Sequence, residues 1–159
     1  PADQAGTYPL PESQLDRFAV RLSLGFPSPE AERQLLRGAS QPLTLSRQLD
    51  TAALATLQAE AEEIHLSEAT LDYLLALVHQ SRIDEALPQP LSPRAARTLL
   101  AVSRAWALVA GRRFVTAEDV QAVFPYVAEH RLRGSFGVQR GEACPLSQRL
   151  LARVDPDRP

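Results

Sequence analysis

The strongest periodic pattern of apolar side chains runs over residues 91–111. Apolar residues recur there at helical spacing and share one face, namely Ala95, Leu99, Val102, Trp106 and Val109. Ser92 is a good N-cap, and Pro93 suits the first helical position, where no backbone N–H is needed. Gly111 is a natural left-handed stop. We therefore expect this helix to form the centre of an all-helical core, with Trp106 buried against residues 71–78.

Weaker patterns predict shorter helices on both sides of this stretch. They cover residues 12–17, 29–38, 51–64, 145–154 and a stretch that Ser67 caps, with Leu71, Leu74, Leu75 and Val78 on its apolar face. A sequence like a capping box starts another helix at Thr116, with Asp119 at the third helical position. Because proline cannot donate a helical hydrogen bond, we expect Pro125 to end that helix and to begin a second one that runs to Arg131. Loops are expected over residues 1–11, 41–47 and 134–144.

Residues 18–24 follow a different period. Apolar side chains alternate strictly there at Phe18, Val20, Leu22 and Leu24, which is typical of a β-strand, and Gly25 and Pro27 end the pattern. A lone strand cannot satisfy its own backbone hydrogen bonds. We therefore expect this strand to belong to a sheet that lies mostly outside the chain.

Composition narrows the class of protein. The chain has 159 residues, of which 45% are hydrophobic and 23% charged, enough for one globular domain with a real core. A net charge of −2 disfavours a helical DNA-binding domain, so we expect no nucleic-acid partner. No apolar run is long enough to span a membrane and no signal peptide is visible, so we expect a cytoplasmic protein. Because the sequence starts at Pro1 and contains no methionine, we expect it to be a piece of a larger protein.

Few residues offer recognisable chemistry. Cys144 is the single cysteine, and the three histidines, His65, His79 and His130, are widely separated, so no metal site is predicted. The sequence contains no Walker-type glycine-rich loop, and no residues with the spacing of a nucleophile and its base. The remaining candidates are two arginines at the ends of predicted elements.

Arg94 lies in the first turn of the helix over 91–111. A cation there opposes the helix dipole at a cost of about 0.3–1 kcal/mol when exposed, whereas an anion bound there would meet both the guanidinium and free N–H groups. Arg94 is thus either a phosphate contact or an ordinary solvated arginine. Arg17 lies where a short helix leads into the predicted strand. It either forms a surface ion pair with Asp16 or reaches a phosphate across a subunit interface.

Several runs resemble the MoxR family of AAA+ ATPases. The run GTYPLPESQLDRF over residues 6–18 and the run VTAEDVQAVFPYVAEHRL over 115–132 are specific to that family. The turn GFPS over 25–28, the sensor 2 motif SPRA over 92–95 and the run AWALVAGR over 105–112 agree with it. The chain departs from the family at Ala5, where glutamate is usual, and at Pro90 and Leu91, which replace Gly-Ala.

The resemblance implies a mainly α fold, in which a helical lid-domain bundle over 28–159 follows one strand left from a truncated α/β AAA+ core over 1–27. It implies that Arg94 is the sensor 2 arginine and that Arg17 is the arginine finger of a neighbouring subunit's site. It also implies that the parent protein binds ATP and Mg²⁺, forms a homo-oligomeric, hexameric ring, and remodels or activates a client, often with a von Willebrand A-domain partner. Since the Walker motifs are missing, the chain alone is expected to be inactive. A helical protein-interaction module without a nucleotide role is the alternative.

Overall fold

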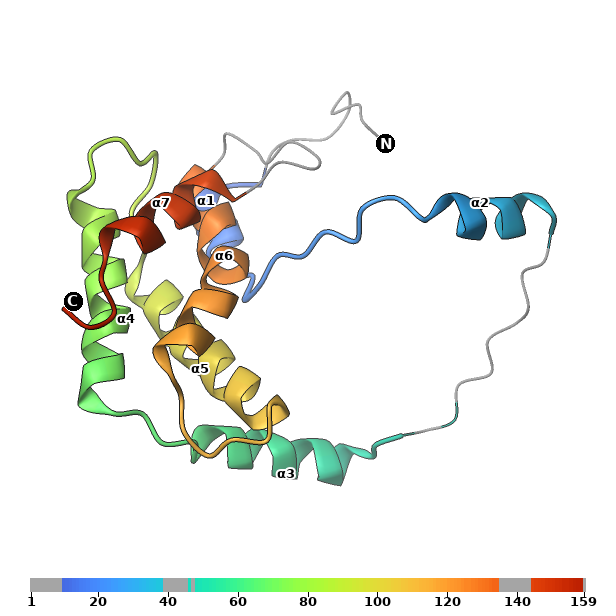
Figure 1. The fold of residues 1–159 in the computed structure, drawn as a ribbon, viewed down its shortest axis with the longest axis horizontal. Coiled ribbons are helices and arrows are strands. Elements are labelled where there is room, and N and C mark those ends of the chain that lie inside the picture. Colours follow the sequence, from blue (N-terminus) through green and yellow to red (C-terminus); the bar gives the residue numbers. More distant parts are fainter. Residues whose placement is uncertain (1–9, 39–45, 47, 135–143, 159) are drawn as a thin grey trace.

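The computed structural model describes residues 10–38, 46, 48–134 and 144–158, and it confirms a mainly helical fold (Figure 1). The helices of this part are α1 (Glu12–Leu15), α2 (Pro29–Leu36), α3 (Thr51–Glu62), α4 (Glu68–Ile83), α5 (Pro93–Val109), α6 (Ala117–Arg133) and α7 (Pro145–Arg153). The described residues contain no strand longer than isolated bridges, one of which joins His65 to Phe114. Most of the three predicted loops lies outside the described residues.

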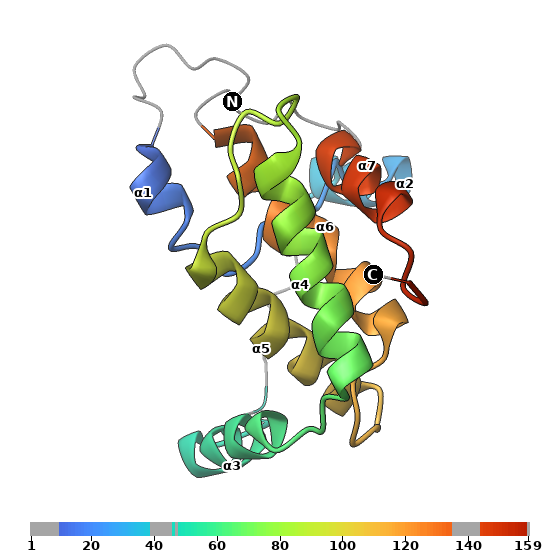
Figure 2. The ribbon, with the colours of Figure 1, turned by 90° about the vertical axis from the view of Figure 1, so that its left-hand side faces the viewer.

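The core lies between α4, α5, α6 and α7, which pack together as a bundle (Figures 1 and 2). Its largest fully buried side chains come from all four helices and include Tyr73, Leu77, Leu99, Phe124, Leu132 and Leu150. α6 contacts α1, α4, α5 and α7, whereas α5 contacts α3, α4 and α6. The centre of the bundle is therefore α6, and not the helix over 91–111 that the sequence pattern favoured.

α6 also corrects the prediction that Pro125 ends a helix. The helix runs through Pro125 without interruption and ends at Arg133. A proline inside a helix costs about 3 kcal/mol. Here Phe124 and Val127 on either side of it are buried to 0% and 1% exposure, so packing of the same helix face on the rest of the bundle outweighs the missing hydrogen bond.

The burial of α5 differs from the predicted stripe. Trp106 is 51% exposed and Val109 is 85% exposed, so the prediction of a buried tryptophan was wrong. The buried residues of α5 are Ala95, Leu99, Ser103 and Ala107, which recur every four positions. Three of these four residues are small, which suits the packing of α5 against α4 and α6, whereas the larger Trp106 and Val109 are exposed.

Residues 18–24 do not form the predicted strand. The segment has one backbone hydrogen bond to the bundle, from the Arg21 N–H to the carbonyl oxygen of Tyr126 at 2.9 Å. Phe18, Leu22 and Leu24 are 55%, 68% and 99% exposed. A strand needs a neighbouring strand to complete its ladder, and none is present among the described residues. That the sheet lies outside the chain stays a prediction.

α2 begins at Pro29 after an N-cap at Ser28, as predicted, and ends shortly before Gly38. None of its residues is buried, and it contacts no other helix. In Figure 1 it lies well away from the bundle. The described chain thus has a packed bundle over 64–134 and 144–154 and an N-terminal part whose apolar side chains are largely exposed.

Polar contacts fasten the ends of the bundle. The buried Glu129 carboxylate accepts hydrogen bonds from the backbone N–H and the hydroxyl of Ser147, both at 2.8 Å, which secures α7 to α6. At the start of α6, Thr116 and Asp119 form the predicted capping box, and Arg112 makes a two-pronged ion pair with Asp119. The hydrogen bonds from Arg112 lower the pKa of the Asp119 carboxyl. The matched run over 115–132 therefore carries structural contacts at its first turn.

Candidate functional site

The N-terminus of α5 is built as the sequence predicted. The Ser92 hydroxyl accepts a hydrogen bond from the Ala95 N–H at 3.1 Å, and Pro93 occupies the first turn. Arg94 follows at the second helical position, and its side chain is 56% exposed. The predicted site residue thus lies at an open helix end with its guanidinium accessible.

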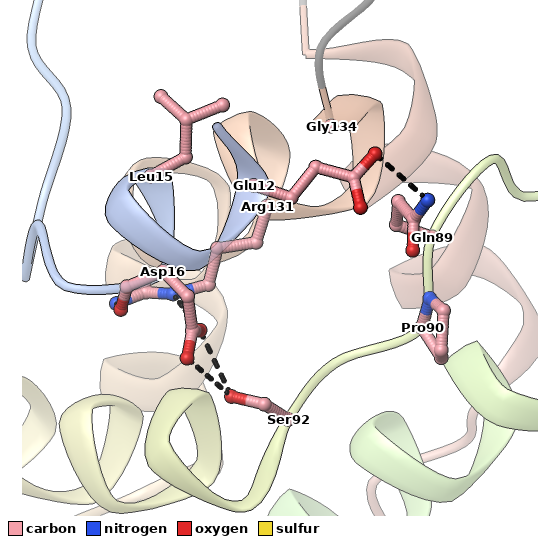
Figure 3. Close-up of a pocket in the computed structure, with 8 residues that line it drawn as sticks. All are labelled: Glu12, Leu15, Asp16, Gln89, Pro90, Ser92, Arg131 and Gly134. Carbon is pink, nitrogen blue, oxygen red and sulfur yellow. Dashed lines mark hydrogen bonds and ion pairs between the residues drawn. The ribbon is translucent and has the colours of Figure 1, made fainter. Parts of the chain in front are cut away.

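An anionic group already lies at this helix end, and it comes from the same chain. Both carboxylate oxygens of Asp16 accept from the Ser92 hydroxyl, at 2.8 and 3.0 Å (Figure 3). The same carboxylate lies 3.8 Å from an Arg94 guanidinium nitrogen. A negative charge here is favourable because it faces the positive end of the α5 dipole.

Asp16 is held in place by Arg131 in the last turn of α6. The Arg131 side chain is 3% exposed, and its Nε donates to Asp16 at 3.1 Å. Its two terminal nitrogens donate to the carbonyl oxygens of Asp16, Phe18 and Ala19, at 3.1, 2.7 and 3.2 Å, and also to that of Val127. One buried guanidinium therefore fastens residues 16–19 to the bundle.

The second predicted site residue, Arg17, lies inside this fastened segment. Its side chain is exposed, and among the described residues it makes no ion pair with Asp16, whose partners are Arg94 and Arg131. Arg17 and Arg94 do not touch each other. They are connected through Asp16, which precedes Arg17 in the chain and contacts the helix that carries Arg94.

Burial lowers the pKa of two ionisable groups in this region, Arg131 and His130. Loss of solvent lowers the pKa of Arg131, and the hydrogen bond and charge of Asp16 oppose that shift, so the guanidinium stays charged at any physiological pH. Burial together with the charge of Arg131 lowers the pKa of His130, although a hydrogen bond to the Phe18 carbonyl favours the protonated ring. The segment is thus held by a permanent cation and by a histidine that prefers to be neutral.

A small pocket of about 180 Å³ opens beside Asp16. Figure 3 shows its lining residues, Glu12, Leu15, Asp16, Gln89, Pro90, Ser92, Arg131 and Gly134. Its polar groups already pair with one another, as in the bond from the Gln89 amide to Glu12 at 3.0 Å. Pockets that enclose drug-sized ligands hold about 300–1,000 Å³. This one is too small and too internally paired to enclose a nucleotide.

Other features of the described part offer little chemistry. No three of its histidine, cysteine, aspartate and glutamate side chains come close enough to hold a metal ion. Burial raises the pKa of the Cys144 thiol, which makes it a poor nucleophile. Within the same residues, no helix is both long and apolar enough to cross a membrane.

The sequence and the fold of this chain are similar to those of known proteins. Residues 79–148 match the family described as the AAA lid domain. The chain is 36% identical over 155 residues to the chaperone MoxR1 of Mycobacterium tuberculosis, a match that covers 91% of this chain and 41% of that protein. It is 32% identical over 135 residues to the uncharacterized protein YeaC of Bacillus subtilis, covering 83% of this chain and 42% of that one. A crystal structure of a candidate ATPase from Cytophaga hutchinsonii has a similar fold, with a TM-score of 0.80, 24% identity, and coverage of 98% of this chain and 51% of that one.

The helical bundle and the matched family define an AAA+ lid domain. The likeness to MoxR1 narrows that class, and the chain carries the C-terminal lid region of a MoxR-type AAA+ protein. It spans less than half the length of the curated relatives it matches.

Sequence reasoning missed the importance of Asp16 and Arg131. The chain did hold a signal for Arg131, because it continues the buried stripe of Val120, Phe124 and Val127 at helical spacing, where a charged residue requires partners. Splitting this helix at Pro125 hid that continuity. No local pattern indicates the partners of Asp16, since they lie 76 and 115 positions further along the chain.

Proposed function

We propose that this chain forms the lid of an ATP-hydrolysing AAA+ protein, in which Arg94 is the sensor 2 arginine that contacts the terminal phosphates of the nucleotide. The supporting observation is the state of Arg94 itself. Its guanidinium is 56% exposed, and its contact with Asp16 is 3.8 Å long. An exposed ion pair contributes about 0–1 kcal/mol, so turning toward a phosphate has little cost.

The residues at this helix end fit a phosphate contact made by a side chain. The Ala95 N–H is already bonded to Ser92, and Asp16 lies beside the first turn, so the exposed guanidinium is the side-chain group that can meet an anion. A terminal phosphate would compete with Asp16 for Arg94. Since no described acidic cluster is suited to a metal ion, Mg²⁺ would be held by residues elsewhere in the protein. Bound MgATP supplies the phosphoryl group that hydrolysis transfers to water.

Arg17 completes the proposal as the arginine finger of the neighbouring subunit's site. An exposed side chain on a segment fastened on both sides is suited to reach across an interface. This role requires a ring, for which we propose a hexamer, with residues 1–27 belonging to the core and 28–159 to the lid. Lid movement would be used to remodel or activate a client, and a von Willebrand A-domain protein is the proposed partner.

The test compares single variants of the complete protein that contains this chain. Arginine fingers contribute about 10³–10⁵ in rate, so we expect Arg17→Ala to abolish most turnover while nucleotide binding remains. We expect Arg94→Ala to weaken ATP binding and slow hydrolysis, and Arg94→Lys to restore only part, because lysine lacks the planar fork. Arg97→Ala is the matched control for Arg94, being an exposed arginine one turn further along α5. Turnover and affinity equal to wild type in Arg94→Ala would remove the sensor 2 assignment.

A mixing experiment separates the two roles. Subunits with Arg17→Ala keep their own nucleotide site, and subunits whose own site is inactivated keep their finger. If Arg17 acts in a neighbour's site, a mixture of the two should be more active than either variant alone. Activity that stays at the level of the separate variants would contradict a role across the interface.

A further inference from the structure

Asp16 joins the two arginines that the proposed function places in different nucleotide sites. Its carboxylate accepts from Ser92 at the N-cap of α5 and lies 3.8 Å from Arg94. Its backbone carbonyl, and that of Phe18 on the other side of Arg17, accept from Arg131. Arg17 thus lies between two residues, Asp16 and Phe18, whose backbone carbonyl groups are both held by Arg131.

The contacts of Asp16 differ in how easily they break. Its partner Arg131 is 3% exposed and is bound at four points within residues 16–19, so this contact is costly to separate. Arg94 is 56% exposed and has only the long contact. An anion that draws Arg94 away would therefore leave Asp16 attached to Arg131, while it changes the charge that Asp16 faces at α5.

We propose that Asp16 is a positioning residue that couples the nucleotide site of one subunit, at Arg94, to the placement of Arg17 in the site of the next subunit. The inference rests on the proposed function and adds a route within this chain between the two sites. When Arg94 turns to a terminal phosphate, Asp16 loses one cationic neighbour and keeps Ser92 and Arg131. With one of its two contacts at the N-terminus of α5 gone, Asp16 is held there less firmly, and so is the segment that carries Arg17.

The experiment measures the response of residues 16–21 to ATP in the complete protein. Backbone amide exchange is followed in this segment, where the Arg21 N–H bonds to the Tyr126 carbonyl at 2.9 Å. We expect ATP to change exchange there by up to about fivefold in the wild type, the limit set by the exposed ion pair of Arg94 with Asp16. In Asp16→Asn, which keeps the size of the side chain and removes its charge, we expect ATP still to bind and the response to disappear.

Glu12→Gln is the matched control. Glu12 lies one helical turn before Asp16 and lines the same pocket, but its hydrogen bond is to Gln89. We expect this variant to keep the full response. Asp16→Glu keeps the charge and should restore part of it. If Asp16→Asn fails to fold, Ser92→Gly removes the hydroxyl that binds Asp16 and keeps an acceptable N-cap, and it should lose the response in the same way.

Steady-state kinetics give a second measurement. We expect Asp16→Asn to lower kcat by up to about fivefold with KM changed less than about twofold, because Arg94 remains available to the nucleotide. A purely structural role for Asp16 would lower the melting temperature and leave the exchange response to ATP intact.

The outcomes separate this inference from the proposed function. A complete protein that neither binds nor hydrolyses ATP contradicts both. ATP binding without any response over residues 16–21 in the wild type overturns the coupling and leaves the proposed function standing. A response that persists at full size in Asp16→Asn also overturns it. Loss of the response in Asp16→Asn, with ATP still bound and Glu12→Gln unaffected, supports it.

Discussion

Apolar side chains are buried in the bundle of this chain and largely exposed in its N-terminal part. In the bundle, Tyr73, Phe124 and Leu150 are all fully buried, whereas Leu22, Leu24 and Phe26 in the N-terminal part are 68%, 99% and 74% exposed. The bundle therefore contains the partners that its sequence requires. The N-terminal part carries apolar side chains whose partners are absent from the described residues, and it is joined to the bundle chiefly by polar contacts.

A leucine-to-alanine substitution in each region is the strongest test of this difference in burial. Leu77 is 0% exposed in α4, and Leu24 is 99% exposed. Removal of a buried leucine side chain costs about 2–5 kcal/mol, and an exposed change usually stays within about 0.5 kcal/mol. We expect Leu77→Ala to lower the free energy of unfolding by the larger amount in urea titrations of this chain, and Leu24→Ala by the smaller. Equal losses would mean that residues 18–26 are covered in solution.

The contacts of Arg131 carry the next largest effect, because they link the two regions. Arg131→Ala removes one donor each from the Asp16 carboxylate and from the carbonyl groups of Phe18 and Ala19. We expect a loss of about 2–3 kcal/mol in stability, together with faster exchange of the Arg21 amide. Arg94→Ala is the control, since its exposed contact with the same carboxylate is worth about 0–1 kcal/mol. Similar losses of stability from both variants would contradict the conclusion that Arg131 makes the main link between the two regions.

A third comparison lies within α5. Ala107 is 0% exposed against the bundle, and its neighbour Trp106 is 51% exposed. Overpacking a core position costs about 1–3 kcal/mol, so we expect Ala107→Leu to destabilise the chain by that amount. For Trp106→Ala we expect about 1 kcal/mol, well below the 3–5 kcal/mol typical of a buried tryptophan. Ready quenching of the Trp106 fluorescence by a soluble quencher checks its exposure directly.

These pairs also show how far the sequence could be read. Helix starts are set by local chemistry, so the caps at Ser28, Ser67, Ser92 and Thr116 were predicted correctly. The buried face of α5 was not, because periodicity finds apolar residues without saying which of them meets another helix. The local rule for Pro125 failed for the same reason, since packing of the whole of α6 outweighs it.

The same distinction between local and long-range information applies to the residues of the candidate site. Arg94 was found because its unusual feature, a cation in a first turn, is local to the sequence. Asp16 and Arg131 take their meaning from contacts between residues more than one hundred positions apart, which no spacing rule supplies. The resemblance marked the run that contains Arg131 without indicating what its side chain does.

The smallest expected effect concerns pH and His130, which also contacts the N-terminal segment. Burial, followed by the charge of Arg131, lowers the pKa of His130, Arg21 adds to that shift, and the Phe18 carbonyl and Asp16 oppose it. A histidine whose pKa is lower in the folded state binds a proton first in the unfolded state as the pH falls. Stability from this group is therefore complete above the unfolded pKa of about 6.5 and declines as the pH falls from there toward the folded pKa.

We expect the melting temperature of the chain to be level from about pH 8 to pH 7 and to decline below about pH 6.5, before the carboxylates titrate at about pH 4. His130→Gln removes the titrating ring and should flatten this decline, because the charge difference between the folded and unfolded states disappears with it. His79→Gln is the matched control, since His79 is exposed on α4, and it should keep the decline. If His130→Gln declines as steeply as the wild type, the contact between His130 and the segment at Phe18 does not set the pH dependence.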